Sequence, residues 1–334
     1  MRLHLNENTA GCSPAVFEAL GRLRRADAGF YPDYDAARAA VARHFRVPGD
    51  FVLLTNGLDE GILVAIGAAF RDRRGGIPET LGVAPAFDMY DTLTTALGGR
   101  MVTVPLGKDF AFDPDAFTAA ITPATKIAFL TNPHNPSGRF EPVQTFIDLA
   151  RAIAPIILFL DEAYADFCEA SAIDADLLAS QPNLLVGRTF SKSYGLAGLR
   201  AGAVIGAPAS LEPLRNIVPP YSLNAWATAA LPAALEDDQY RDWYCGQAAT
   251  SRALIAGACA SLGLDTWPSA ANFALVRIGD RATDVVRELS ARGVRVRDRS
   301  MEPGCEGCIR VTAGVVDDTR RAIDALTEVL CDGR

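Results

Sequence analysis

The amino-acid sequence predicts an α/β protein with a mostly parallel seven-stranded sheet sandwiched by helices, followed by a smaller α+β domain. Over residues 51–205, short apolar runs alternate with longer alanine-rich amphipathic stretches, which is typical of alternating strands and helices. After Pro219 and Pro220 the pattern changes to one long helical stretch and then to short strands separated by helices. With 334 residues, 49% of them hydrophobic, the chain is long enough to bury two cores.

The seven strands of the first sheet are short apolar runs bounded by turn residues. We expect them at residues 51–55, 81–84, 101–104, 127–131, 156–160, 184–186 and 201–205. A helix over 225–262 is expected to break near Pro232, because proline lacks the backbone N–H that a helix interior uses. The remaining elements are expected as strands at 272–278, 294–297 and 308–312 and as helices at 283–292 and 317–330.

These elements divide the chain into three parts. Residues 1–27 carry too little apolar surface to fold alone, so we expect an arm that packs on the small domain and on a partner chain. Residues 28–235 are expected to form the large domain and residues 236–334 the small one. Open α/β sheets bind ligands beyond the carboxyl ends of their strands, so the residues that follow each strand are the candidates for a site.

The composition limits the kinds of partner that the chain binds. A formal net charge of −8 argues against a nucleic-acid or anionic-membrane surface, both of which favour basic patches. No apolar run is long enough to span a bilayer and no signal peptide is recognisable, so we expect a cytoplasmic protein that acts on small molecules. The seven cysteines are scattered, which fits reduced thiols. Cys305 and Cys308 lack the second ligand pair that a zinc site needs, so no metal is expected.

One lysine stands among residues suited to covalent chemistry. Lys192 follows an apolar run, and a second run of small apolar residues follows Arg200. A lysine that attacks a carbonyl needs a lowered pKa, and a neighbouring cation such as Arg200 can help to lower it. Thr189, Ser191 and Arg200 could also hold a phosphate. Most lysines are solvated surface charges, but a buried lysine beside a phosphate grip predicts pyridoxal 5′-phosphate as the cofactor.

The first strand is followed by a glycine turn that opens a helix. Free backbone N–H groups and the helix dipole favour a phosphate there, and Gly57, Leu58 and Asp59 could supply the contacts. The alternative is a helix that is simply capped by Asn56 or Asp59. Only the presence of other phosphate-binding residues favours the first interpretation.

Three more strands end in residues that suit a pyridine ring. Phe87 could stack on the ring or belong to the core, and Asn135 could donate to a phenolic oxygen or only form its turn. Asp161 ends an apolar strand that should be buried, and a buried carboxylate needs a partner. A protonated ring nitrogen is such a partner, whereas a helix cap is the alternative. Tyr164, three residues further on, could bond the opposite edge of the ring.

The order of these motifs resembles that of the fold-type I pyridoxal-phosphate-dependent aminotransferases, most closely the histidinol-phosphate aminotransferase branch. The resemblance covers nearly the whole chain and rests on several motifs together. They are Leu5-Asn-Glu-Asn8, Tyr31-Pro-Asp33, Asn56-Gly-Leu-Asp-Glu60, Asn132-Pro-His-Asn-Pro-Ser-Gly138, Asp161-Glu-Ala-Tyr164, Ser191-Lys192, Arg200, Val296-Arg-Asp-Arg-Ser300 and Ile309-Arg-Val-Thr-Ala-Gly314.

The resemblance implies a role for each candidate residue. Lys192 would be the Schiff-base lysine that also moves the substrate proton, and Asp161 would pair with the ring nitrogen. Tyr31 would reach the phosphate from the other subunit, which implies a homodimer with shared active sites. The other cofactor-binding positions implied are Gly57, Leu58, Asp59, Phe87, Asn135, Tyr164, Thr189, Ser191 and Arg200.

The resemblance also implies two substrate-binding arginines. Arg310 matches the residue that grips a substrate carboxylate, and Arg297 matches one that helps to hold a substrate phosphate. Arg297 could instead be a surface charge, because Arg295 and Arg299 alternate with it on what would be an exposed strand face. Ala10 stands where the family usually has a tyrosine beside the substrate phosphate, which opens the question of the donor.

The expected activity is transfer of an amino group from L-histidinol phosphate to 2-oxoglutarate. Alternatives within the fold are an aromatic amino-acid aminotransferase and a decarboxylase that acts on threonine phosphate. A regulator that only senses the cofactor is less favoured, because Lys192 and Asp161 are both kept. A plain nucleotide-binding domain is weaker still, since no G-x-G-x-x-G follows the first strand.

Overall fold

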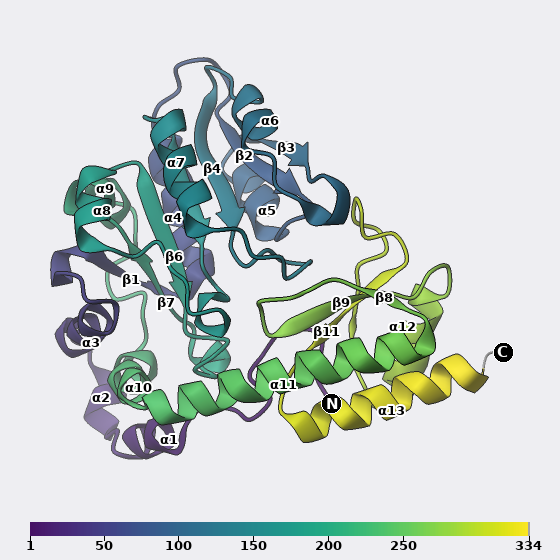
Figure 1. The fold of residues 1–334 in the computed structure, drawn as a ribbon. Coiled ribbons are helices and arrows are strands. Elements are labelled where there is room, and N and C mark those ends of the chain that lie inside the picture. The colour runs from purple at the N-terminus through teal and green to yellow at the C-terminus, as the bar shows by residue number, and fades with distance from the viewer. Residues whose placement is uncertain (333–334) are drawn as a thin grey trace.

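The structure, a computed structural model that describes residues 1–332, is built around two sheets (Figure 1). The larger sheet has seven strands in the order β1-β7-β6-β5-β4-β2-β3. They are β1 (Val52–Asn56), β2 (Glu79–Ala84), β3 (Arg100–Pro105), β4 (Thr125–Thr131), β5 (Ile157–Asp161), β6 (Leu184–Thr189) and β7 (Ala201–Ile205). The mostly parallel seven-stranded sheet expected from the sequence is confirmed.

Strand direction brings the candidate residues to one edge of this sheet. All its strands run the same way except β7, which is antiparallel to both of its neighbours, β1 and β6. The start of β7 therefore lies beside the ends of β1 and β6, where Gly202 pairs with Thr189. Arg200, just before β7, consequently reaches the same edge as Lys192, just after β6.

Helices cover both faces of the larger sheet, because its strands alternate apolar residues between two cores. In β4, for example, Ala128 and Leu130 pack in one core, whereas Ile127 and Phe129 pack in the other. Helices α4, α5 and α9 lie on the second face. The helices of this part are α1 (Pro14–Gly21), α2 (Arg25–Gly29), α3 (Asp35–Phe45), α4 (Leu58–Ala69), α5 (Met89–Ala96), α6 (Pro114–Ala119), α7 (Val143–Ile153), α8 (Ala175–Ser180), α9 (Pro208–Arg215) and α10 (Ala225–Glu236).

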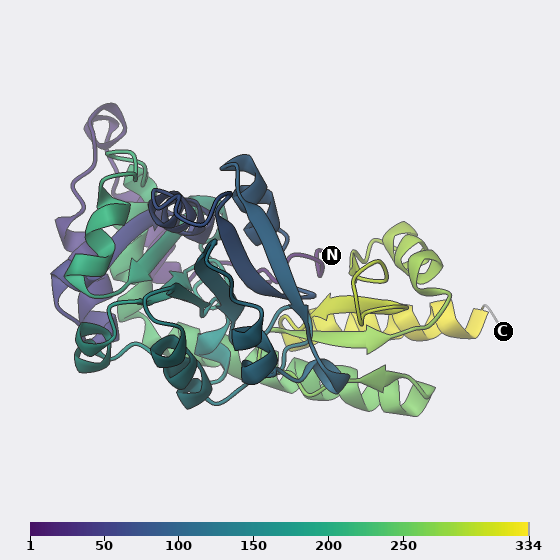
Figure 2. The same cartoon turned by 90° about the horizontal axis from the view of Figure 1, so that it is seen from above.

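The second sheet is smaller and antiparallel, and its core is separate from those of the first (Figure 2). It has the strand order β10-β11-β9-β8 and packs against two long helices that lie side by side, α11 and α13. The elements of this part are α11 (Asp238–Leu262), β8 (Asp265–Thr266), β9 (Phe273–Arg277), α12 (Ala282–Ala291), β10 (Arg297–Asp298), β11 (Cys308–Thr312) and α13 (Val316–Asp332).

The first residues of the chain add a segment to this second sheet. The backbone N–H of Leu3 donates to Arg295 O at 2.8 Å, and the N–H of Thr312 donates to Leu3 O at 2.9 Å. The first residues of the arm therefore pack on the small sheet. The division at residues 27 and 235 stays a prediction.

Two expected elements differ in the structure. The long helical stretch does not break at Pro232, which lies inside α10, but at Asp237, whose backbone leaves the helical region and whose side chain accepts from Tyr240 N. The strand expected at 294–297 is displaced to β10, because Arg295 pairs with the N-terminal arm instead. Among residues 1–332, no helix is long and apolar enough to cross a membrane.

Candidate functional site

Two adjoining hollows open at the edge where the parallel strands of the larger sheet end. We call them the inner and the outer hollow. The inner hollow is lined by Leu58, Asp59, Ile62, Phe87, Thr131, Asn135, Asp161, Ala163, Tyr164, Thr189, Ser191, Lys192 and Arg200. The outer hollow shares six of these residues, Phe87, Asn135, Tyr164, Ser191, Lys192 and Arg200, and is otherwise lined by Arg2, His4, Leu5, Asn6, Glu7, Asp88, Ala197, Gly198, Arg297, Arg299 and Arg310.

Asp161 is held by two hydrogen bonds at the end of β5. The Tyr90 hydroxyl donates to Asp161 Oδ2 at 2.6 Å, and the backbone N–H of Ala163 donates to Oδ1 at 2.9 Å. Burial raises the pKa of Asp161 to about 6, against the lowering effect of these two donors. The carboxylate is thus mostly ionised at pH 7 and suited to pair with one further proton donor in the inner hollow.

Lys192 is partly buried, and its amine makes a single hydrogen bond in the described structure. Its Nζ donates to the carbonyl oxygen of Leu5, in the N-terminal arm, at 3.0 Å. The pKa of Lys192 is lowered to about 8. Burial is the main cause, and the positive charge of Arg310 is the next. The neighbouring cation is therefore Arg310, whereas Arg200 forms an ion pair with Asp59 at 2.8 Å. At neutral pH a useful fraction of the amine is free to act as a nucleophile.

The start of α4 forms a cradle with free backbone donors. Gly57 caps the helix without any side-chain hydrogen bond, so neither Asn56 nor Asp59 caps it, contrary to the alternative interpretation. Its φ of +74° suits glycine, and a Cβ there would lie 2.5 Å from a guanidinium nitrogen of Arg200. Helix N–H groups and a guanidinium converge here, which fits a phosphate.

Two hydroxyls from the turn after β6 line the same hollow. Thr189 Oγ1 lies 3.0 Å from Ser191 Oγ and also accepts from Ser191 N at 3.3 Å. Together with Asp161 and Lys192 they place a phosphate grip, a carboxylate and an amine around one hollow. The residues present therefore fit a phosphorylated pyridine aldehyde.

The turn after β4 is locked to the loop after β2 through His134. Because Pro85 O can only accept, His134 Nε2 donates to it at 3.0 Å, and Nδ1 accepts from Ser137 Oγ at 2.8 Å. Burial lowers the pKa of His134 to about 4, so the ring stays neutral. This lock fixes Asn135 and the loop of Phe87 on adjoining walls of the hollow.

Asn135 and Tyr164 lie beside the arginine of β11. Asn135 Oδ1 accepts from Arg310 Nη1 at 2.5 Å, which leaves its amide N–H₂ group for another acceptor. The Tyr164 hydroxyl accepts from Asn6 Nδ2 at 3.0 Å. Arg310 also donates to His4 O at 3.0 Å, and its guanidinium lies over the Phe273 ring. Burial lowers the pKa of Arg310 to about 10, with Arg299 and Arg297 lowering it too.

The three alternating arginines after α12 do not share one environment. Arg297 is half exposed at the rim of the outer hollow, 3.9 Å from Asp88. Arg295 is exposed, in line with the alternation, but the side chain of Arg299 is only 4% exposed. Placing Arg299 on an exposed strand face is therefore wrong. The strand ends at Asp298, which accepts from Ser300 N and turns the chain inward.

Two residues singled out from the sequence lie outside both hollows in this chain. Tyr31 is 79% exposed, and its ring stacks on that of Tyr221 with centroids 4.4 Å apart. Ala10 is exposed in the turn before α1. Neither contributes to the hollows formed by residues 1–332 of one chain.

Sequence reasoning missed Tyr90, the partner of Asp161. It stands three residues after Phe87, at the start of α5, and is fully buried between Asp161 and Thr131. The only sequence signal for Tyr90 was its position shortly after the end of a strand. Its contact with β5 depends on how the folded helix α5 orients the side chain. Burial raises the pKa of Tyr90, so its hydroxyl keeps the proton that it donates.

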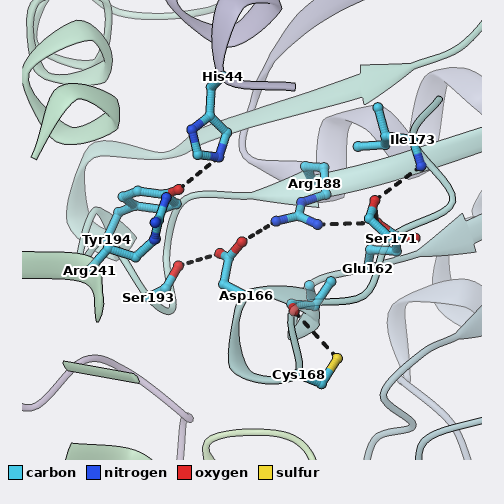
Figure 3. A network of polar contacts seen from close by, with 12 residues as sticks. His44, Glu162, Asp166, Cys168, Ser171, Ile173, Arg188, Ser193, Tyr194 and Arg241 are labelled. Carbon is cyan, nitrogen blue, oxygen red and sulfur yellow. Dashed lines mark hydrogen bonds and ion pairs between the residues drawn. The ribbon is translucent and has the colours of Figure 1, made fainter. Parts of the chain in front are cut away.

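A buried network behind Lys192 was also missed (Figure 3). Arg188, in β6, contacts Glu162 at 3.1 Å and forms a second ion pair with Asp166. Ser193, the neighbour of Lys192, donates its hydroxyl to Asp166, whereas Ser171 donates to Glu162 at 2.5 Å. The network thus connects the ends of β5 and β6 and anchors the loop that carries Lys192.

The two cysteines around the start of β11 are expected to be unreactive as thiols. Cys305 and Cys308 are both free and buried, and burial raises the pKa of their thiols to about 12 and about 11. Within residues 1–332 no group of three or more histidine, cysteine or acidic residues is arranged to hold a metal ion.

Comparison with known proteins agrees with this geometry. Residues 1–326 match the family described as aminotransferase class I and II. A histidinol-phosphate aminotransferase of Nitratidesulfovibrio vulgaris is 38% identical, over 99% of this chain and 88% of the relative. Histidinol-phosphate aminotransferase 2 of Pseudomonas fluorescens is 34% identical, over 100% and 90%. The structure of the Sinorhizobium meliloti histidinol-phosphate aminotransferase in complex with pyridoxal-5′-phosphate superposes with a TM-score of 0.88 at 29% identity, over 100% of this chain and 91% of that one.

The lowered pKa of Lys192 predicts how the protein without cofactor captures pyridoxal phosphate. Because only the neutral amine attacks an aldehyde, the capture rate should rise about tenfold between pH 7 and pH 9 and then level off. Stopped-flow absorbance measures this rate. Arg310→Met removes a positive charge that lowers the pKa of Lys192, so the midpoint of the pH–rate profile should move to higher pH. Because both proteins capture the same aldehyde, comparing their two midpoints cancels the effect of the aldehyde's own titration. A rate that still climbs steeply above pH 10 would contradict the assignment.

Ser193→Ala and Ser171→Ala separate positioning from stability in the buried network. Each removes one hydroxyl that donates to a buried carboxylate, so each should cost about 1.5–3 kcal/mol of unfolding free energy. Only Ser193→Ala should also slow capture of the cofactor, by up to about a hundredfold if Lys192 shifts by roughly 1 Å. Urea unfolding and stopped-flow absorbance measure the two effects. Equal slowing by both variants would show that the network acts only through stability.

Proposed function

Since the chain belongs to the class I and II aminotransferases, which use pyridoxal phosphate, we propose that its amino donor is L-histidinol phosphate and its acceptor 2-oxoglutarate. The products are imidazole acetol phosphate and L-glutamate. One observation carries this proposal: relatives that are 34–38% identical over nearly the full chain are histidinol-phosphate aminotransferases. The cationic outer hollow beside Lys192 is consistent with anionic substrates.

Lys192 and Asp161 are the residues to which we assign the chemistry. Bound pyridoxal phosphate supplies an aldehyde and an electron-withdrawing ring. The amine of Lys192, with its pKa near 8, would bond to the aldehyde and, once released, carry a proton to and from the substrate carbon. The carboxylate of Asp161 would hold a proton on the ring nitrogen, and the donor hydroxyl of Tyr90 would keep that carboxylate ionised.

The remaining residues of the inner hollow would hold and orient the cofactor. The amide of Asn135 and the hydroxyl of Tyr164 would bond its phenolic oxygen, and Phe87 would stack on its ring. The phosphate would be held by the start of α4 and by the turn after β6. The residues assigned to this phosphate grip are Gly57, Leu58, Asp59, Thr189, Ser191 and Arg200.

Two arginines would divide the work on the substrates. Arg310 is buried and fixed by Asn135 and His4, so its guanidinium is oriented before a substrate carboxylate arrives. Arg297 is half exposed at the rim and would help with the phosphate of the donor. One hollow would then accept both a phosphate-bearing donor and a dicarboxylate acceptor.

Ala10 is the feature that favours a second candidate, an aromatic amino-acid aminotransferase. A position where the family usually has tyrosine offers no hydroxyl to a phosphate here. Against this candidate, Ala10 lies outside both hollows of its own chain, and five arginines, Arg2, Arg200, Arg297, Arg299 and Arg310, line the outer hollow. Their charge favours an anionic substrate over a neutral aromatic one.

The donor can be identified by single-turnover spectra of the enzyme loaded with pyridoxal phosphate. Histidinol phosphate should react with a kcat/KM about 10- to 100-fold above that of phenylalanine or tyrosine, because its phosphate gains charge-assisted hydrogen bonds. Threonine phosphate tests for release of carbon dioxide, and Lys192→Ala serves as the inactive control. Faster reaction with phenylalanine than with histidinol phosphate would sink the proposal.

We also propose that the enzyme is a homodimer whose two sites share residues. Tyr31 and Tyr221 form an exposed aromatic stack next to Phe30, which is exposed as well. A second copy of the chain would cover this surface and receive Tyr31 at its own phosphate grip. The described cysteines are all free, which fits a reducing compartment such as the cytoplasm.

Sedimentation equilibrium should give twice the monomer mass for the purified protein. Tyr31→Phe should keep that mass but weaken retention of the cofactor, because it removes only the hydroxyl. Ile77→Ala, a substitution at an exposed residue away from Tyr31, is the matched control. A fully active monomer would contradict the shared site.

A further inference from the structure

Arg299 is a buried cation that the proposed chemistry does not use. It follows β10 and is fixed on both sides by its backbone, since its N–H donates to Cys308 O and its C=O accepts from Glu302 N, both at 3.0 Å. Its side chain is 4% exposed and lines the outer hollow with Arg297 and Arg310. A guanidinium buried at the wall of a substrate hollow needs partners for its charge and for its donors.

The protein supplies only part of what Arg299 needs. Glu302 provides a negative charge in an ion pair with Nη2 of Arg299, but Nε of Arg299 is buried without a hydrogen-bond partner. The Nε atom of Arg310 is also buried and unpartnered. The Nε donors of Arg299 and Arg310 are therefore unused.

The charges that face Arg299 are unbalanced. Arg299 and Arg297 both lie close enough to Arg310 to lower the pKa of Arg310. The other cations of the hollow are Lys192, Arg200 and Arg2, whereas burial lowers the pKa of His4; its carboxylates are Glu7 and Asp88, with Glu302 behind the wall. Of these, Glu7 already pairs with Arg2 at 2.6 Å. An oxyanion between the arginines would relieve their mutual repulsion and accept from the unused donors.

We propose that Arg299 is a specificity-determining residue that binds the oxyanion at the far end of the substrate together with Arg297, while Arg310 keeps its role on the substrate carboxylate and Glu302 is the counter-ion of Arg299. This inference rests on the proposed function, because it assigns the phosphate of the donor and the distal carboxylate of the acceptor to one subsite. Lys or Gln at position 299 would lose the planar fork that fits either oxyanion.

Binding of two simple anions to the enzyme loaded with pyridoxal phosphate tests this role. Because the cofactor then occupies its own phosphate grip, inorganic phosphate and glutarate report on the substrate subsite. Calorimetry should show that Arg299→Gln weakens the binding of both anions about 10- to 100-fold, with Arg299→Lys in between. Arg295→Gln, an exposed arginine four residues earlier that does not line the hollow, should bind both like the wild type.

Glu302→Gln should have the opposite effect on anion binding. It removes the carboxylate that competes with the ligand for Arg299, so phosphate should bind several-fold more tightly. In steady-state kinetics, Arg299→Gln should raise the KM of the anionic substrates more than it lowers kcat. Thermal unfolding monitors whether each variant is folded.

The outcomes separate this inference from the proposed function. If the wild type does not use histidinol phosphate but Arg299→Gln still loses anion binding, the donor is wrong and the role of Arg299 stands. If phosphate binds but glutarate does not, the subsite is confined to the donor phosphate. Unchanged affinity for both anions in a folded Arg299→Gln protein, or no measurable binding of either by the wild type, would overturn the inference.

Discussion

Burial of a carboxylate and an amine at the same edge of the larger sheet is the constraint on which the rest of the site depends. Asp161 ends one strand and Lys192 follows the next, and the side chains of both strands are packed between two helical layers. Removing water raises the pKa of the first to about 6 and lowers that of the second to about 8, so both titrate close to neutrality. Because both groups are removed from water, each needs hydrogen-bonding or charged partners within the protein.

The partners come from three distant parts of the chain. Tyr90 of α5 donates to Asp161, Leu5 of the N-terminal arm accepts from Lys192, and Arg310 of β11 adds a positive charge nearby. The arm and β11 belong to the small sheet, so that sheet contributes, after burial, to lowering the pKa of a residue on the large one. The network around Arg188 holds the lysine loop from the other side (Figure 3).

Much of this arrangement was predictable from sequence, because apolar runs mark strands and polar residues that follow them meet at one edge. The seven strands, Asp161, Lys192 and the glycine turn before α4 followed from that rule. The rule does not give strand direction, so the reversal of β7 that delivers Arg200 required the folded sheet. Tyr90 and Arg299 were missed for a similar reason: whether a side chain turns inward depends on the helix or turn that carries it, not on its neighbours in sequence.

Lys192 is the one amine that we expect to hold the cofactor. Reduction of the loaded protein with borohydride fixes any pyridoxal phosphate that is bonded to an amine, and mass spectrometry of the digested protein locates it. We expect one adduct per chain, on the peptide that contains Lys192, and none on the exposed Lys108. An adduct on another lysine, or labelling spread over several of them, would contradict the account.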